Sequence, residues 1–150
     1  MNAIATVTAD LGKTPYTVRL TDDLGHTWLA DEPADQQGAN FGPSPVRLLI
    51  ASLGACTAIT VKMYAVRKNW PLEGVEIRVK LMTYVPVPES GTSMVLEITL
   101  HGPLTPEQRE RLLAIANACP VHRILTSEVK IETFLEEAPS STQARAGSGG

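Results

Sequence analysis

A long apolar segment in the middle of the chain limits the folds that are open to it. Ser44 suits the N-cap of a helix and Pro45 its first position, and apolar residues then follow on nearly every side through Tyr64, until residues 69–71 end the pattern. A helix that is apolar all round is a buried helix. Small residues within 51–55 would let other elements approach its backbone closely. The rest of the chain must therefore enclose this helix.

Short β-prone stretches lie on both sides of the helix in the sequence. Residues 4–8, 16–21 and 26–30 are separated by turn sequences, which is typical of an antiparallel meander. Apolar and charged residues alternate over 75–81 and again over 94–100, as in strands that are buried on one face. The sequence thus predicts strands before and after the apolar helix.

A second helix and a last strand complete the predicted order. Thr105 and Gln108 have the spacing of a capping box, with proline at the first helical position, and the helix should continue to Ala118. Alternation over residues 129–133 predicts a final strand. The order of strands, buried helix, strands, helix and strand predicts an α+β fold with antiparallel sheets around a central helix.

Length and charge narrow the class of protein. The 150 residues suffice for one domain, which we expect over 1–137, followed by a disordered tail over 138–150. A formal charge of -3 and a pI near 5.6 give no general attraction for nucleic acid or an anionic membrane. No apolar run approaches the roughly 20 residues of a membrane span, and residues 1–10 do not have the pattern of a signal peptide. We therefore expect a cytoplasmic protein.

The chain has two cysteines, Cys56 and Cys119. Cys56 lies in the apolar helix, where a thiol is shielded from water. Cys119 precedes Pro120, a residue favoured at the first position of a helix, so its sulfur would face unpaired N–H groups that stabilise a thiolate. Two thiols can reduce a peroxide, because one forms a sulfenic acid and the other condenses with it to a disulfide. The residues alone leave two interpretations open, a redox couple or two unrelated core residues.

Other candidate sites have a weaker basis in the sequence. Cys119 and His122 have the spacing of two zinc ligands, but Cys56 and the other histidines supply no second close pair, so we expect no metal. The two prolines in 42–45 remove N–H groups that a phosphate loop would need. We expect the adjacent carboxylates at 31–32 to be solvated. No cofactor site is predicted.

Three motifs are similar to those of a known family. They are GPSPVRLL (42–49), ASLGACTA (51–58) and CPVH (119–122), together with GHT (25–27) and DEP (31–33). In this order they resemble the OsmC/Ohr family of thiol-dependent hydroperoxide reductases, and its OsmC-like branch in particular.

The resemblance implies a fold and a mechanism. The family fold has two antiparallel sheets that enclose buried helices, paired as an intertwined homodimer with both active sites at the subunit interface. Cys56 would be the peroxidatic cysteine and Cys119 would resolve it. The substrate would be an organic hydroperoxide and the reductant a dithiol, with no metal or flavin.

The chain departs from the family where the first thiol is activated. Family peroxidases use an arginine before the buried helix and a glutamate at its start, but Val46 and Arg47 stand at that start and no arginine lies between Leu20 and Val46. Arg47 is the candidate replacement, although nine residues of helix place it opposite Cys56 and about 13 Å along the axis. We expect a cysteine-based peroxidase for organic hydroperoxides; the alternative is a non-catalytic OsmC-like dimer that binds an apolar small molecule.

Overall fold

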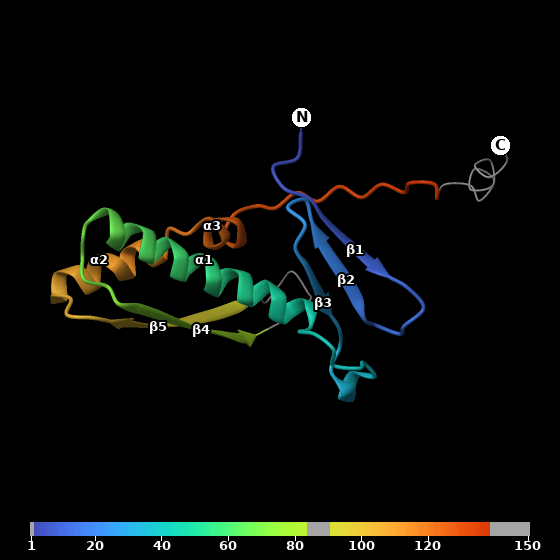
Figure 1. Ribbon diagram of the computed structural model, residues 1–150, viewed down its shortest axis with the longest axis horizontal. Helices are drawn as coiled ribbons and strands as arrows, with labels where there is room; N and C mark the ends of the chain where they lie inside the picture. The colour runs from blue at the N-terminus through green and yellow to red at the C-terminus, as the bar shows by residue number, and fades with distance from the viewer. Residues whose placement is uncertain (1, 84–90, 139–150) are drawn as a thin grey trace, which may run out of the picture.

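The computed structural model describes residues 2–83 and 91–138 and confirms the expected α+β class. Its elements in chain order are β1 (Val7–Leu11), β2 (Val18–Asp22), β3 (Thr27–Ala30), a 3₁₀ helix (Ala34–Gln36), α1 (Pro45–Arg67), β4 (Gly74–Thr83), β5 (Ser93–His101), α2 (Pro106–Ala116) and α3 (Pro120–Leu125). Figure 1 shows the arrangement: β1–β3 lie beyond the N-terminal end of α1, whereas β4, β5, α2 and α3 lie along the length of that helix.

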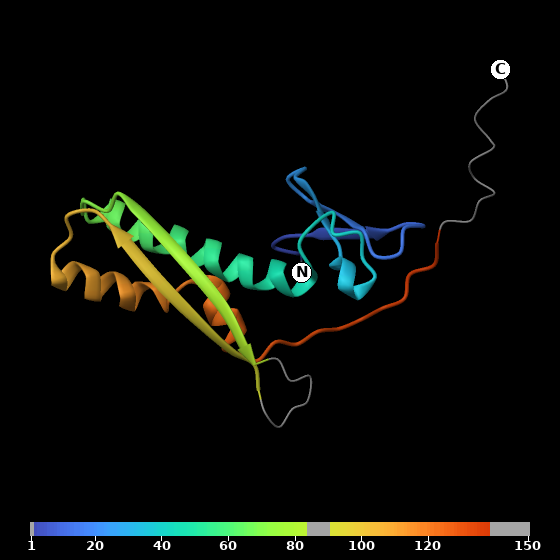
Figure 2. The same cartoon turned by 90° about the horizontal axis from the view of Figure 1, so that it is seen from below.

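The N-terminal sheet is the antiparallel meander that the turn sequences predicted. Strand β2 lies in the middle, and its residue Val18 pairs with Leu11 on one side and Ala30 on the other. Every residue of β1 is exposed. The sheet stands apart from the β4–β5 hairpin in both views (Figures 1 and 2). It is therefore largely uncovered in the described part of the single chain.

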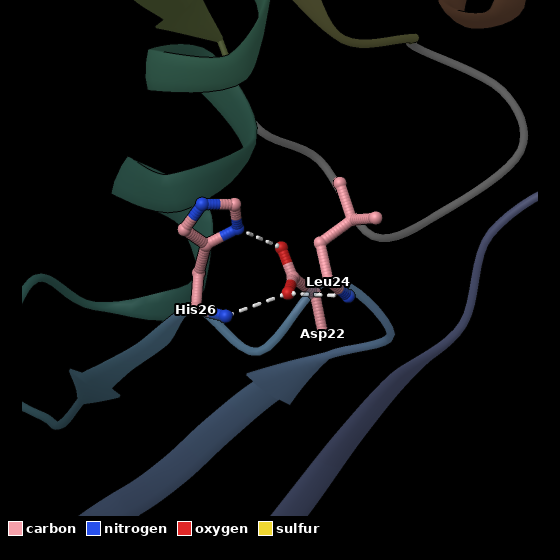
Figure 3. A network of polar contacts seen from close by, with 3 residues as sticks. All are labelled: Asp22, Leu24 and His26. Carbon is pink, nitrogen blue, oxygen red and sulfur yellow. Dashed lines mark hydrogen bonds and ion pairs between the residues drawn. The ribbon is translucent and has the colours of Figure 1, made fainter.

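One carboxylate holds the turn between β2 and β3. Asp22 Oδ1 accepts hydrogen bonds from the backbone N–H groups of Leu24 (3.0 Å) and His26 (2.8 Å), and Asp22 Oδ2 lies 2.8 Å from His26 Nδ1 (Figure 3). Gly25 has a φ of 90°, which glycine adopts at little cost. The side-chain contact with His26 is the largest influence that lowers the pKa of Asp22. These contacts fix the chain reversal that starts β3.

Strands β4 and β5 form an antiparallel hairpin that packs against α1. Ile77 pairs with Ile98 and Val79 with Leu96, and these apolar side chains are half-buried while the charged residues between them are exposed. Both strands confirm the alternating patterns. Helix α1 approaches the sheet closely at Gly54, because a Cβ there would lie 3.3 Å from Val79 Cγ2. The expected role of a small residue in the helix is confirmed at this position.

The core lies between α1, the hairpin and α2. Its buried residues are Val61, Ala65, Leu72, Leu104, Leu112 and Ala116. The capping box of α2 is present, since the Thr105 hydroxyl accepts from the N–H of Gln108 and the Gln108 side chain accepts from the N–H of Thr105. The helix ends at Ala116, two residues earlier than expected.

Burial of α1 on all sides was predicted, and in the single chain this is wrong. Its buried residues are Leu53, Thr57, Val61 and Ala65, which follow one another at a spacing of four and form one stripe. The exposed apolar residues of the helix are Val46, Leu49, Ile59, Met63 and Val66. The physical reason is that the hairpin, α2 and α3 cover one side of the helix only.

The expectation that no segment could match a membrane span is also corrected. Helix α1 has 23 residues and a mean hydropathy of 1.6 over its most apolar window, so it is long and apolar enough to cross a membrane by length and composition. A core helix meets the same criteria, and α1 contributes Val61 and Ala65 to the core of this domain.

The strand expected over residues 129–133 does not form in the single chain. After α3 the backbone runs away from the core in both views, with no regular structure from 128 to 138 (Figures 1 and 2). Val129, Ile131, Phe134 and Leu135 are exposed. A strand needs a neighbour for its backbone hydrogen bonds, and the described residues supply none for this segment. The predicted tail falls mainly on residues 139–150, which lie outside the described part, and the domain boundary at residue 137 stays a prediction.

Asp31 is not solvated as expected, because it is only 2% exposed. Its carboxylate accepts hydrogen bonds from Thr17 Oγ1 (2.9 Å) and from the backbone N–H groups of Glu32 (2.8 Å) and Phe41 (3.2 Å). Burial acts to raise the pKa of Asp31, but these hydrogen bonds outweigh it and hold the pKa below its ordinary value. The carboxylate thus links β3 to the loop that leads into α1.

Candidate redox site around the two cysteines

Cys119 is the N-cap residue of α3. Its backbone is extended, with φ -66° and ψ 148°, and Pro120 occupies the first helical position. Cys119 Sγ accepts a hydrogen bond from the backbone N–H of His122 across 3.3 Å, and the residue is fully buried. The prediction that this sulfur faces the unpaired N–H groups of a helix is confirmed. A negative charge on a sulfur in this position is stabilised by that N–H group.

Thr57 brings α1 into contact with the same sulfur. The Thr57 hydroxyl oxygen lies 3.5 Å from Cys119 Sγ, and the hydroxyl donates to the carbonyl oxygen of Leu53 across 2.8 Å. Both Thr57 and Cys119 have no exposed surface. Sequence reasoning missed Thr57. The available signal was its position: Thr57 is a polar residue directly after Cys56, and it lies four residues after Leu53 on the stripe of α1 that is buried.

Cys56 is the residue before Thr57 and is half-buried. Successive residues of an α-helix are turned by about 100°, so the Cys56 side chain leaves α1 beside the one that contacts Cys119. Both thiols are free. The fold therefore brings Cys119 into contact with the residue that follows Cys56, although the two cysteines are 63 positions apart in the sequence.

A cavity of about 530 Å³ opens next to this junction. Its lining comes from α1, the start of β5 and α3, and consists of Leu49, Leu53, Thr92, Ser93, Met94, Leu96, His122, Leu125 and Thr126. The side chains are mainly apolar, with His122 as the titratable residue. Leu49 and Leu53 lie seven and three residues before Cys56, on the same side of α1. The volume is in the range of small-molecule pockets.

Arg47 lies at the start of α1, away from this junction. Its Nη1 donates a hydrogen bond to Ser44 Oγ across 3.2 Å, so the guanidinium is held at the N-cap of the helix. The structure does not bring Arg47 to Cys56 within one chain. Its role in catalysis stays a prediction.

The described residues contain no cluster of three or more possible metal ligands. Cys119 and His122 do approach each other, but through the backbone N–H of His122 and the sulfur.

Solved structures show the same fold as this chain. An OsmC-like protein of Mycoplasma pneumoniae aligns with a TM-score of 0.68 at 18% identity, over 83% of this chain and 89% of that one. The organic hydroperoxide resistance protein OsmC of Legionella pneumophila gives 0.62 at 21% identity, over 83% and 92% of the two chains. The organic hydroperoxide resistance protein OhrB of Bacillus subtilis gives 0.56 at 22% identity, over 83% and 91%. These identities establish the fold alone.

Sequence comparison identifies the family. Comparison with curated proteins gave no match. The model of the OsmC-like protein family matches residues 36–134, which include all of α1, both cysteines and the hairpin. The resemblance seen in the three sequence motifs is confirmed for a match that spans about two-thirds of the chain, and this chain belongs to the OsmC-like protein family.

Proposed function

We propose that this protein is a cysteine-based peroxidase that reduces organic hydroperoxides, with Cys56 as the nucleophile and Cys119 as the resolving thiol. The observation that carries the proposal is the contact of Cys119 Sγ with Thr57, the residue next to Cys56. Two relatives of the same fold are named organic hydroperoxide resistance proteins, which supports the same class of substrate here.

The reaction uses the two thiols in turn. The Cys56 thiolate attacks one oxygen of the hydroperoxide, the O–O bond breaks, an alcohol leaves and Cys56 becomes a sulfenic acid. The Cys119 sulfur then attacks the Cys56 sulfur, the S–O bond breaks and water leaves as the disulfide forms. An external dithiol reduces this disulfide and restores both thiols. Overall, one hydroperoxide and two thiols give one alcohol, one water and one disulfide.

The cavity lined by α1, β5 and α3 supports an organic rather than an inorganic peroxide. Its wall is mainly apolar and includes Leu53 of α1 and Met94 of β5. Its volume of about 530 Å³ is larger than a molecule of hydrogen peroxide needs. The alkyl group of the substrate would occupy this space, with the peroxide directed toward Cys56.

We further propose a cytoplasmic homodimer. In the described part of one chain the β1–β3 sheet is largely uncovered, α1 presents an apolar side to solvent and residues 128–138 have no strand partner. A second copy that covers these surfaces would remove all three exposures at once.

Mass spectrometry after one equivalent of cumene hydroperoxide tests the reaction. We expect the wild type to lose about two hydrogens as an intramolecular Cys56–Cys119 disulfide forms, and Cys119→Ser to stop at the sulfenic acid. Cys56→Ser should consume no peroxide. Separate over-oxidised cysteines in the wild type, with no disulfide, would contradict the couple.

A non-catalytic dimer that binds an apolar small molecule is the second candidate function. It is favoured by the position of Arg47, which is held at Ser44 rather than near Cys56. Two results together would support this function instead. The protein would not consume the peroxide, and it would bind an apolar fluorescent probe saturably, with binding abolished by Leu53→Glu in the cavity wall.

A further inference from the structure

Thr57 makes the one side-chain hydrogen bond to Cys119 Sγ within residues 2–83 and 91–138. We propose that Thr57 is a positioning residue for the second thiol, Cys119. The single hydroxyl proton of Thr57 is donated to the Leu53 carbonyl while Cys119 is a thiol, and to Cys119 Sγ when Cys119 becomes a thiolate. The inference rests on the proposed peroxidase function and concerns its second step.

The hydrogen bonds define the resting arrangement. A hydroxyl has one proton, and Thr57 donates it to the carbonyl oxygen of Leu53 at 2.8 Å. Toward Cys119 the hydroxyl oxygen therefore presents a lone pair, which accepts the S–H of the thiol across 3.5 Å. Cys119 Sγ in turn accepts from the N–H of His122. In this arrangement the buried sulfur donates to Thr57 and accepts from His122.

Attack on the Cys56 sulfenic acid requires the thiolate of Cys119. Rotation about the C–O bond of Thr57 moves the hydroxyl proton from the Leu53 carbonyl to the sulfur without any movement of heavy atoms. The Leu53 carbonyl keeps its helical partner in α1. The thiolate then accepts two hydrogen bonds, from Thr57 and from the backbone N–H of His122, at a sulfur with no exposed surface. The proton of Cys119 passes to the oxygen of the Cys56 sulfenic acid, so that water leaves as the S–O bond breaks and the S–S bond forms.

The position of Thr57 restricts its effect to the second thiol. Its hydroxyl is directed at Leu53 and Cys119, whereas the Cys56 side chain leaves the helix in another direction. Loss of the hydroxyl should therefore change the formation of the disulfide and leave the oxidation of Cys56 unchanged.

The test compares Thr57→Val, which has nearly the same shape without the hydroxyl, with Thr57→Ser, which keeps it. After rapid mixing with cumene hydroperoxide, loss of the Cys56 thiol and appearance of the disulfide are followed separately. We expect Thr57→Val to change the rate of Cys56 oxidation by no more than about twofold and to slow disulfide formation about tenfold. A tenfold change is what a rise of one unit in the pKa of the attacking thiol would cause through its thiolate population. Thr57→Ser should restore the second rate. Thr60→Val, the same change one turn along α1, should behave as the wild type.

A second readout does not depend on peroxidase activity. In a Cys56→Ser background, the pH midpoint of the ultraviolet thiolate absorbance of Cys119, a signal that needs no reagent to enter the fold, should rise by about one unit on Thr57→Val and return with Thr57→Ser. An unchanged midpoint, or disulfide formation by Thr57→Val at the wild-type rate, would overturn the role of Thr57. A wild type that forms no disulfide would refute the proposed function, whereas the absorbance midpoint tests the role of Thr57 whether or not a disulfide forms.

Discussion

The guanidinium of Arg47 donates to Ser44 Oγ across 3.2 Å, so the last cationic residue before Cys56 in the sequence is tied to the start of α1. This contact explains how a basic side chain is accommodated in the first turn of α1. In one chain Arg47 stabilises the N-cap and has no contact with either thiol.

Arg47→Met should therefore leave the chemistry of Cys56 unchanged. We expect superimposable profiles of Cys56 alkylation rate against pH for the variant and the wild type, and equal rates of peroxide reduction. Arg67→Met, at the other end of α1, is the matched control for loss of one charge. A slowing of about tenfold by Arg47→Met alone would show that Arg47 reaches the Cys56 of a second subunit.

Leu112→Ala should lower the free energy of unfolding by about 2–5 kcal/mol, because it leaves a cavity in the core. Leu112 is 1% exposed, whereas its neighbour Leu113 is 55% exposed. Leu113→Ala should change stability by less than about 0.5 kcal/mol in the same urea titration. Equal effects of the two variants would mean that Leu113 is buried in the assembly.

Gly54→Val should destabilise the domain by about 1–3 kcal/mol, since its branched side chain would be forced against Val79. Ala114→Val, on the exposed side of α2, introduces the same side chain where there is room and should cost less than about 0.7 kcal/mol. Urea denaturation measures both. A neutral Gly54→Val would show that α1 and β4 can separate without loss of stability.

Asp31→Asn should lower stability at pH 7 but have less effect in acid. The folded-state pKa of Asp31 lies below its ordinary value, so the charged carboxylate contributes stability above about pH 4, and this contribution is lost as the pH falls through the folded pKa. The difference in melting temperature between the wild type and Asp31→Asn should thus shrink below about pH 4. Asp35→Asn, at an exposed position of the same loop, is the control.

Sedimentation should detect a dimer that does not dissociate before it unfolds. We expect this because the exposed side of α1 and the uncovered β1–β3 sheet carry large apolar side chains that a second copy would cover. A folded monomer at micromolar concentration would contradict the homodimer and remove the interface from the proposed mechanism.

Local sequence signals predicted much of the fold. The N-cap and proline at Ser44–Pro45 located the start of α1, and the capping box at Thr105 located α2. Alternation of apolar and charged residues predicted β4 and β5, because one face of each strand packs against α1 while the other face is exposed. The Cys119-Pro120 sequence predicted the sulfur at a helix terminus, since proline at the first turn fixes where that terminus falls.

Features that depend on distant segments were not predictable. Thr57 and Cys119 are 62 residues apart, and no local pattern states that they touch. Asp31 has the local sequence of a solvated carboxylate, but Thr17 on one side and the returning chain at Phe41 on the other bind it. The strand expected over 129–133 had the right alternation, but its formation depends on a neighbouring strand that the described residues of this chain do not provide.

The complete burial of Cys119 makes this thiol a natural reporter of opening motions. Because the side chain has no exposed surface in the folded state, a labelling reagent can reach it only after α3 separates from α1 or the domain unfolds. When closing is faster than labelling, the labelling rate measures the free energy of that opening. The chain thus carries its own probe of local stability at the place where the proposed chemistry occurs.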